Sequence, residues 1–419
     1  MELPASLHVA AGDAVARWNP WMIGIGFRRQ DVMNAGHSRA RNGSGANLRR
    51  AAALLASVAL VAALAACQPG PGPGPTPSQS GSPSQSGSAS PSGVPSPSGA
   101  AKPGHVFVIN LENKSYRDVW GEQSEAPYLS RTLRPQGELL TQYFAIGHSS
   151  LTNYIAQLSG QGPNPATSHD CPTYEPFSAT GTASLGQLEG SGCVYPDSVP
   201  TLAGQLSAAG KTWKGYMEDM GTPCRHPEPG AKDRNQSASA DGQYATRHNP
   251  FVYFTGITAS PECQSNVVDF SNLATDLTSA STTPNLSYIS PNLCNDGHDS
   301  PCADGRPGGL ATADEWLRQH VPEILSSEAF KQDGLLVITF DEAEGKESAE
   351  SSLPGGAGGG RVGALLLSPL VKAGSASDRP YNHYSLLASI EDAFNLPYLG
   401  YAAAADLSRF GPDVYNAGS

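Results

Sequence analysis

Charged residues and long apolar runs are both scarce in this chain of 419 residues. Only 15% of its residues are charged and 7% are aromatic, and its longest uncharged apolar run, 51–66, has 16 residues, fewer than a membrane-spanning helix usually needs. Positive charge is scarcest in 104–419, where 18 Lys and Arg face 35 Asp and Glu. This excess of negative charge repels nucleic acid, which we exclude as a partner. An anionic substrate would need compensation by metal ions, Arg or backbone N–H groups.

The apolar run 51–66 is typical of the core of an export signal. Four arginines precede it, at positions 39, 41, 49 and 50, and it ends in Leu-Ala-Ala-Cys at Cys67. This ending looks like a bacterial lipobox, which predicts a lipid anchor on Cys67; the alternative is ordinary signal-peptidase cleavage. Residues 1–32 do not fit a signal. We expect Met33 to be the true start and 1–32 to be a gene-model extension, the alternative being an unusually long n-region.

The segment after Cys67 lacks what a buried core requires. Of the 36 residues in 68–103, 27 are Pro, Gly or Ser, and Lys102 is the one charged residue. Such a composition predicts a flexible linker. The signal therefore spans 33–67 and the linker 68–103, and 104–419 is long enough for one large domain outside the cytoplasm.

The chain contains no Cys-x-x-Cys pair, which argues against a cysteine-based metal site. Six cysteines lie in 104–419, an even number that predicts three disulfides in an exported domain. Proximity in the sequence suggests the pairs Cys171–Cys193, Cys224–Cys263 and Cys294–Cys302. Metal-binding cysteines remain the alternative.

Apolar runs and helical patterns alternate along 104–419. Strands are predicted at His105–Leu111, 335–340, 362–367, 286–290 and 212–217. Helices are predicted at 198–209, with Ser198 as N-cap, at 312–330 and at 384–394. The nearly continuous apolar character of the first strand is typical of a parallel sheet. We therefore predict an α/β fold with a mainly parallel central sheet flanked by helices.

Three of these strands run directly into polar residues. The first is followed by Glu112-Asn113, the strand 335–340 by Asp341-Glu342, and the strand 286–290 by a loop that contains Asp296 and His298. Ligands of open parallel sheets bind beyond the carboxyl ends of the strands. Carboxylates and amides favour Mg²⁺, Ca²⁺ or Mn²⁺, whereas added histidine favours Zn²⁺ or Fe. The pattern predicts a divalent metal site at this edge.

A serine pair marks a predicted helix start after His148. Ser149 or Ser150 would lie at the N-terminus of the helix, where free N–H groups and the helix dipole favour a phosphate. The alternative is that one of them is only the N-cap.

Six short motifs together carry a family resemblance. In order, they are Glu112-Asn-Lys-Ser-Tyr116, Ser150-Leu-Thr-Asn-Tyr154 with Ser159-Gly160, Arg247-His-Asn-Pro-Phe251, Asn295-Asp-Gly-His298, Thr339-Phe-Asp-Glu342, and His383-Tyr-Ser-Leu386 with Glu391-Asp-Ala-Phe394. Over 104–419 the chain resembles the bacterial phosphoesterase family of secreted acid phosphatases and phospholipases C, in the alkaline-phosphatase superfamily. The resemblance implies an alkaline-phosphatase-like fold.

The resemblance also implies roles for individual residues. Ser150 matches the nucleophile, in a segment that relatives usually write Ser-Leu-Pro-Asn-Tyr; Thr152 stands here for the proline. The implied metal-site positions are Glu112, Asn113, Ser150, Asp341 and Glu342, with Asp296, His298 and His383 as positions for a second metal or the phosphate. Asn153 and His248 would contact the transferring phosphoryl group, and His298 and His383 would stabilise the leaving oxygen.

Two further residues are candidates for substrate binding. Arg247 adjoins His248 and would compensate phosphate charge, although a surface arginine is the alternative. His148 adjoins the nucleophile and would orient it, or would make only a structural hydrogen bond.

These observations predict an exported, lipid-anchored, metal-dependent acid phosphatase that hydrolyses small phosphate monoesters through a phosphoserine. The alternatives are a phospholipase C-type phosphodiesterase, a phosphoinositide phosphatase, and a non-catalytic surface binding protein.

Overall fold

The computed structural model describes residues 102–344, 353–355 and 358–416. The predicted signal, Cys67 and nearly all of the predicted linker lie outside these residues. Within them, no helix combines the length and the apolar character that crossing a bilayer would require.

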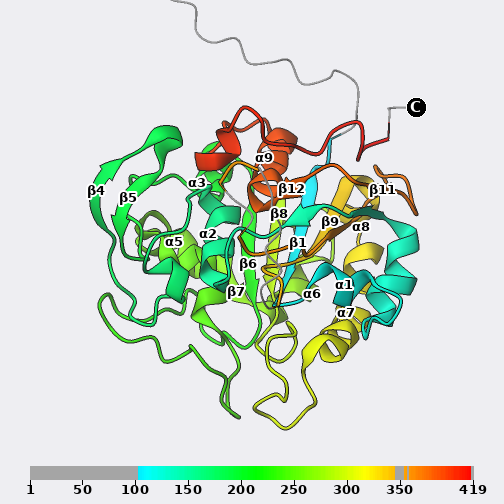
Figure 1. Ribbon diagram of the computed structural model, residues 1–419, viewed down its shortest axis with the longest axis horizontal. Coiled ribbons are helices and arrows are strands. Elements are labelled where there is room, and N and C mark those ends of the chain that lie inside the picture. Colours follow the sequence, from blue (N-terminus) through cyan, green and yellow to red (C-terminus); the bar gives the residue numbers. More distant parts are fainter. Residues whose placement is uncertain (1–101, 345–352, 356–357, 417–419) are drawn as a thin grey trace, which may run out of the picture. The chain divides into compact units, whose positions relative to one another are not determined.

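A central eight-stranded sheet organises the described residues (Figure 1). From one edge to the other, its strands are β11 (Ala376–Ser377), β2 (Glu138–Leu140), β10 (Ala364–Leu367), β9 (Gly334–Phe340), β1 (His105–Leu111), β8 (Leu286–Ser290), β6 (Trp213–Met217) and β7 (Val267–Asp269). All neighbours are parallel except at β10, which is antiparallel to both β9 and β2. The predicted mainly parallel sheet is confirmed, and the predicted strand 362–367 is the one that runs against the others.

The strand β1 lies at the centre of the sheet and is buried along its whole length. It pairs with β9 on one side and β8 on the other, with Val108 opposite Val337 and Tyr288. Its apolar run therefore faces packed side chains on both faces of the sheet. The carboxyl ends of β8, β1 and β9 consequently meet side by side.

Two groups of helices flank the sheet (Figure 1). In one group, α2 (Ser150–Ser159) packs against α9 (His383–Phe394) and α3 (Leu202–Ala208). In the other, α7 (Gly309–Ser326) packs against α8 (Glu328–Asp333) and the 128–133 turn that follows α1 (Tyr116–Trp120). Three short helices, α4 (Thr255–Thr258), α5 (Pro261–Asn266) and α6 (Leu273–Asp276), lie near β6 and β7 in the chain.

Capping side chains explain where the helices differ from prediction. The predicted helix 198–209 begins only at Leu202, because Thr201 rather than Ser198 caps it, with Oγ1 accepting from Gly204 N at 3.1 Å. The predicted helix 312–330 is two helices, α7 and α8. Ser327 separates them, since its hydroxyl caps α8 by accepting from Phe330 N at 3.2 Å.

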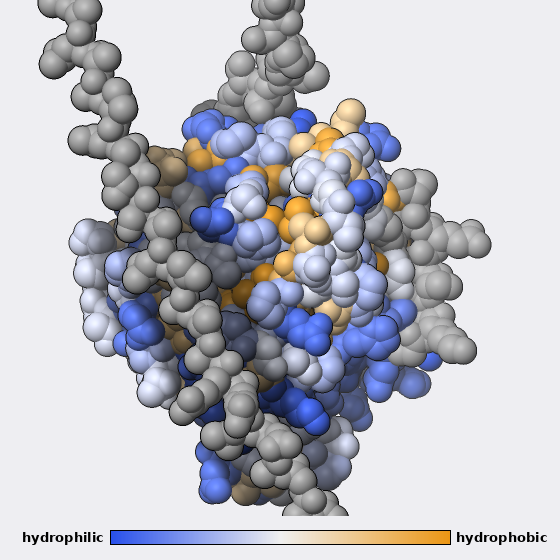
Figure 2. Space-filling model, turned by 90° about the vertical axis from the view of Figure 1, so that its left-hand side faces the viewer, coloured by the Kyte–Doolittle hydropathy of each residue, from blue (hydrophilic) through white to orange (hydrophobic). Residues whose placement is uncertain are grey.

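Three disulfides join the cysteines in the pairs suggested by sequence proximity: Cys171–Cys193, Cys224–Cys263 and Cys294–Cys302. The first lies at the base of a hairpin of β4 (Ser178–Thr182) and β5 (Leu188–Ser191), which the sequence did not predict. Figure 2 shows polar and apolar residues interspersed on this side of the molecule. A second small sheet pairs β3 (Tyr143–Phe144) with β12 (Tyr381–Asn382) and holds the start of α9 beside the segment that leads to α2.

Candidate active site

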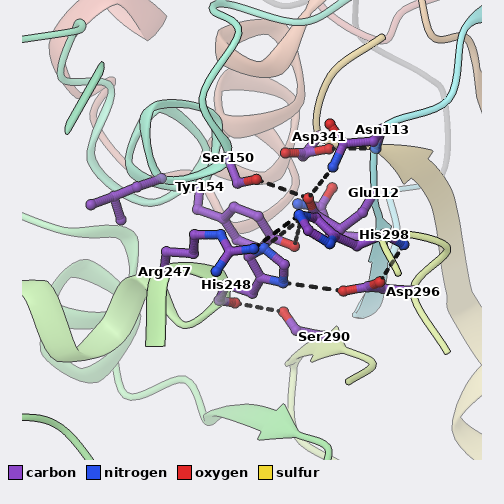
Figure 3. Close-up of polar contacts among 12 residues, drawn as sticks. Glu112, Asn113, Ser150, Tyr154, Arg247, His248, Ser290, Asp296, His298 and Asp341 are labelled. Atoms are coloured by element: carbon purple, nitrogen blue, oxygen red, sulfur yellow. Dashed lines mark hydrogen bonds and ion pairs between the residues drawn. The ribbon is translucent and has the colours of Figure 1, made fainter. Parts of the chain in front are cut away.

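The ends of three neighbouring strands form the candidate site (Figure 3). Glu112 follows β1, Asp341 follows β9, and Asp296 lies in the loop after β8. Backbone hydrogen bonds fix these ends together: Glu112 N donates to Asp296 O at 2.9 Å, and Asp341 N donates to Leu111 O at 2.8 Å. The predicted convergence of polar residues at this edge is present.

The carboxylate of Glu112 is the centre of the cluster and has no exposed surface. Its Oε2 accepts from Ser150 Oγ at 2.9 Å and from Asn113 Nδ2 at 3.3 Å, and its Oε1 accepts from Tyr154 OH at 2.6 Å. Burial, followed by repulsion from Asp341 and Asp296, raises the pKa of Glu112 well above its ordinary value.

Ser150 is the first residue of α2, and its hydroxyl points to Glu112 (Figure 3). Ser149 occupies the N-cap position, but its side chain donates to Ser168 O at 2.8 Å. The carboxylate of Asp170 instead accepts from Leu151 N at 2.9 Å, and so satisfies a free N–H group in the first turn of α2. Ser149 is thus the N-cap residue that the alternative named, although its hydroxyl makes no capping hydrogen bond, and Ser150 is free to take the other predicted role.

Asn113 and Asn153 both shape the backbone around the cluster. Asn113 has a left-handed backbone (φ 55°), and its N–H donates to Asp341 Oδ1 at 3.0 Å. The Oδ1 of Asn153 accepts from Ile146 N at 2.8 Å, and its Nδ2 donates to Gly147 O at 2.8 Å. Both ends of this amide therefore hold the loop before Ser150, and the contact of Asn153 with the phosphoryl group stays a prediction.

His248 lies between two buried carboxylates and stacks on Tyr154, with ring centroids 5.3 Å apart. Its Nε2 is 3.4 Å from Glu112 Oε1, and its Nδ1 is 3.1 Å from Asp296 Oδ2. The ring thus lies close to both carboxylates, yet the atoms are not aligned for hydrogen bonds. Both ring nitrogens lack a hydrogen-bond partner, as does Asp296 Oδ2.

These orphaned atoms fit a divalent cation. Glu112, His248 and Asp296 each offer a ligand atom within 4.8 Å of the other two, and Asp341 Oδ2 is a further buried oxygen without a hydrogen-bond partner. Buried polar atoms normally have partners, and a mixed imidazole and carboxylate set suits Zn²⁺, Fe or Mn²⁺. Part of the predicted metal set is thus brought together, with His248, predicted as a phosphate contact, in a ligand position.

The pKa shifts show how poorly this cluster tolerates its own negative charge. Burial raises the pKa of Asp296 well above its usual range, that of Asp341 to about 6, and that of Glu342 to about 10. Repulsion from Asp341 adds to the shift of Glu342. Burial also lowers the pKa of His248, which keeps its imidazole neutral and able to bind a cation.

Arg247 is the buried cation nearest this cluster, with 4% of its surface exposed. Its Nη1 donates to Gln236 O at 2.7 Å and its Nη2 to His298 Nε2 at 3.0 Å. It forms no ion pair with a carboxylate of the described residues. The alternative of a surface arginine is therefore wrong, and a buried guanidinium without a paired carboxylate favours binding of an anion.

Three further histidines predicted for the site make hydrogen bonds to named groups. His298 shares its Nδ1 proton with Asp299 Oδ1 at 2.7 Å and meets Arg247 through Nε2, so neither nitrogen faces the orphaned atoms. His383 is fully buried, and its Nε2 donates to the backbone oxygen of Asp341 at 2.7 Å. The roles of His298 and His383 at a second metal or at the phosphate stay predictions. His148 Nδ1 lies 3.0 Å from Glu342 Oε2. Glu342, a predicted metal ligand, thus has a hydrogen-bond partner in His148.

A groove of about 860 Å³ opens beside His298. Its lining is mostly polar or charged, and includes Lys114, Arg117, Glu122 and Glu125, with Leu310 as an apolar contributor. His298, which lines the groove, is also the hydrogen-bond partner of Arg247.

Two residues of the site were missed in the sequence. Tyr154 follows Ser150 by one helical turn, a spacing that places both on one face of α2, and Asp170 precedes a cysteine in a loop with no local pattern. The Ser150–Tyr154 spacing was available as a signal, whereas nothing in the sequence indicated Asp170.

Several known proteins are similar to this chain. The sequence profile of the Phosphoesterase family matches residues 122–397. A phosphate-repressible acid phosphatase of Penicillium chrysogenum is 28% identical over 64% of this chain and 54% of its own length. A phosphatidylinositol-3-phosphatase of Mycobacterium tuberculosis is 27% identical over 72% of this chain and 80% of its own.

The chain spans only part of some relatives, between 54% and 59% of the first three, which are all fungal acid phosphatases. Among solved structures, a protein in the alkaline phosphatase superfamily from Vibrio parahaemolyticus matches 74% of this chain and 73% of its own, with a TM-score of 0.45 and 13% identity.

Proposed function

Because the chain belongs to the phosphoesterase family, we propose that it is an extracytoplasmic acid phosphatase that hydrolyses phosphate monoesters through Ser150. The observation that carries this proposal is the Ser150 hydroxyl on the buried Glu112 carboxylate, beside orphaned ligand atoms and an unpaired buried arginine. Three disulfides support a location outside the cytoplasm. Attachment to the membrane through a lipid on Cys67 is part of the proposal.

A serine hydroxyl needs activation before it attacks phosphorus. Bound by Glu112, His248 and Asp296, with Asp341 as a further carboxylate, a divalent cation supplies positive charge that lowers the pKa of the hydroxyl and offsets the charge of the phosphate. The hydrogen bond to Glu112 Oε2 holds Ser150 Oγ in one direction. The buried Arg247 binds phosphoryl oxygens and holds phosphorus in line with Oγ.

The reaction then proceeds in two displacements. Ser150 Oγ forms a bond to phosphorus as the bond from phosphorus to the alcohol oxygen breaks, and the alcohol oxygen takes up the proton that the serine hydroxyl loses. Water then attacks the phosphoseryl group from the opposite face, which releases inorganic phosphate and restores the serine hydroxyl. The groove beside His298 receives the alcohol, and its mostly polar lining favours a polar leaving group.

Substrate preference tests this proposal directly. With Arg247 and a cation available, the site is suited to a phosphate dianion, so we expect 4-nitrophenyl phosphate to be cleaved more efficiently than bis(4-nitrophenyl) phosphate, by roughly 100-fold in kcat/KM. The measurement is nitrophenolate release by the purified protein. Faster cleavage of the diester would move the assignment to a phospholipase C-type enzyme, and cleavage of neither would favour a binding protein.

A phosphoinositide is the second candidate substrate, because the mycobacterial relative is named a phosphatidylinositol-3-phosphatase. Phosphate release from a short-chain phosphatidylinositol 3-phosphate, compared with release from a soluble sugar phosphate, separates the two classes of monoester.

Arg247 is expected to act mainly on substrate binding. In the variant Arg247→Lys the two-pronged guanidinium is lost, and we expect KM for the monoester and Ki for inorganic phosphate to rise together by roughly tenfold or more. Arg225→Lys is the matched control, since Arg225 is exposed and donates to Met220 O and Asn235. Unchanged phosphate inhibition in Arg247→Lys would remove this residue from the phosphate site.

A further inference from the structure

Polar residues continue along the face of α2 that carries Ser150, toward the C-terminal end of the helix and into the protein interior. Tyr154 and Gln157 follow at helical spacing, and both are buried although both are polar. The hydroxyl of Tyr154 donates to Glu112, as that of Ser150 does. Gln157 lies two turns below Ser150 and makes no contact with Glu112, so it needs a separate explanation.

The amide of Gln157 joins three elements that meet beneath the site. Its Nε2 lies 3.2 Å from Asn110 Oδ1 in β1 and 3.1 Å from His383 Nδ1 in α9. Its Oε1 accepts from Tyr288 OH in β8 at 2.9 Å. Both protons and the oxygen of this amide are therefore used.

The hydrogen bonds of His383 fix the direction of this network. Its Nε2 faces the backbone oxygen of Asp341 at 2.7 Å, and a carbonyl can only accept, so Nε2 carries the proton. Its Nδ1 is then an acceptor with a single lone pair, which Gln157 Nε2 and Tyr143 OH, both at 3.1 Å, share. The donors and acceptors agree along the whole path from α2 to Asp341.

We propose that Gln157 is a positioning residue that fixes the helix of the nucleophile against the strand ends that carry Glu112 and Asp341. The proposal rests on the proposed function of Ser150. The helix α2 has ten residues and moves as one rigid element. Loss of the hydrogen bonds of Gln157 would therefore let the whole helix shift and would displace Ser150 relative to Asp341. Gln157 touches no reacting atom, and its effect should fall on the rate of the chemical step rather than on substrate binding.

The test uses the variant Gln157→Met, which is close to the native side chain in volume and removes all three hydrogen bonds. We expect kcat for 4-nitrophenyl phosphate to fall by roughly 10- to 100-fold while KM stays within about twofold. We also expect the affinity for Zn²⁺, measured by calorimetric titration of the chelator-treated protein, to fall by roughly tenfold, because the hydrogen-bonded support of the Asp341 backbone is loosened.

Ser159→Ala is the matched control, because Ser159 is buried in the same helix and its hydroxyl bonds Ile155 O in the preceding turn. It should keep kcat within about twofold of wild type. A similar loss of kcat in Ser159→Ala, or a Gln157→Met protein with native kcat and Zn²⁺ affinity, would overturn the proposal. If Gln157→Met does not fold, Tyr288→Phe removes one of the three bonds and should show a smaller loss of the same kind. If wild-type protein releases no phosphate, the proposed function fails, and the Zn²⁺ affinities alone decide the role of Gln157.

Discussion

Replacement of Ser150 by alanine is expected to lower kcat for a phosphate monoester by at least about 10³-fold. The variant removes the oxygen that attacks phosphorus, and no neighbouring hydroxyl has its place: Ser149 is bonded to Ser168, and Tyr154 is held by Glu112. The fold should persist, because Ser150 contributes one hydrogen bond to a carboxylate that keeps Tyr154 and Asn113 as donors. Steady-state kinetics and a thermal unfolding curve measure the two effects.

The adjacent serine provides the control for this variant. Ser149→Ala loses a hydrogen bond to a backbone oxygen outside the cluster, and its kcat should stay within about threefold of wild type. Trapping with a ³²P-labelled monoester at low pH should label wild type and Ser149→Ala on serine but not Ser150→Ala. Full turnover by Ser150→Ala would refute the serine mechanism whatever the effect on stability.

Removal of divalent cations is expected to have the second largest effect. Chelation should lower monoester turnover by roughly 10²-fold or more, since the buried carboxylates then offer no positive charge to the phosphate. Zn²⁺ should restore activity better than Ca²⁺, because His248 contributes an imidazole to the orphaned atoms. Glu112→Gln should show the same loss without chelation, whereas Glu228→Gln, an exposed carboxylate that does not line the groove, should not.

Cation binding should also depend on pH in a defined direction. Burial raises the pKa of Asp341 to about 6 and that of Glu342 to about 10. Between about pH 4, where the unfolded chain releases these protons, and the raised pKa of each group, the folded and cation-free protein still holds them. Its free energy of unfolding therefore falls as pH rises from about 4 to those raised values. A cation at the site replaces the proton of Asp341, so the melting temperature gained on adding Zn²⁺ should be about 5 °C or more at pH 7 and smaller at pH 5.

Measuring the melting temperature of the protein with Zn²⁺ and after chelation isolates the contribution of the cation site. Glu138 and Glu391 also have raised pKa values, to about 7 and about 9, but neither belongs to the cluster, so they titrate alike in both samples. A gain in melting temperature that is independent of pH would place the cation elsewhere.

The elements that carry the site were predictable because their patterns are strong. The strand β1 matches its predicted bounds, since a continuous apolar run between polar residues has few other ways to be buried. From three such strands, the rule that parallel carboxyl ends meet at one edge placed Glu112, Asp341 and Asp296 together. The reversed direction of β10 had no signal, because strand pairing depends on the path of the whole chain.

Side-chain directions were the part that the sequence could not supply. His383 occupies the position of a motif residue, yet the pairing of β3 with β12 sets the start of α9 so that its ring lies beneath Asp341. Asn153 turns back to the loop that precedes its own helix. Both directions follow from tertiary contacts between distant segments, which local patterns do not contain.

The three disulfides have a consequence for when the protein becomes competent. Cys171 follows Asp170, Cys224 and Cys263 enclose Arg247 and His248, and Cys294 and Cys302 enclose Asp296 and His298. Each bridge therefore constrains a loop that contributes to the site, and such constraints arise only where thiols are oxidised. In protein with reduced cysteines these loops are untethered, so we expect the proposed phosphatase to reach full activity only after its thiols have been oxidised, which comparison of reduced and oxidised protein measures.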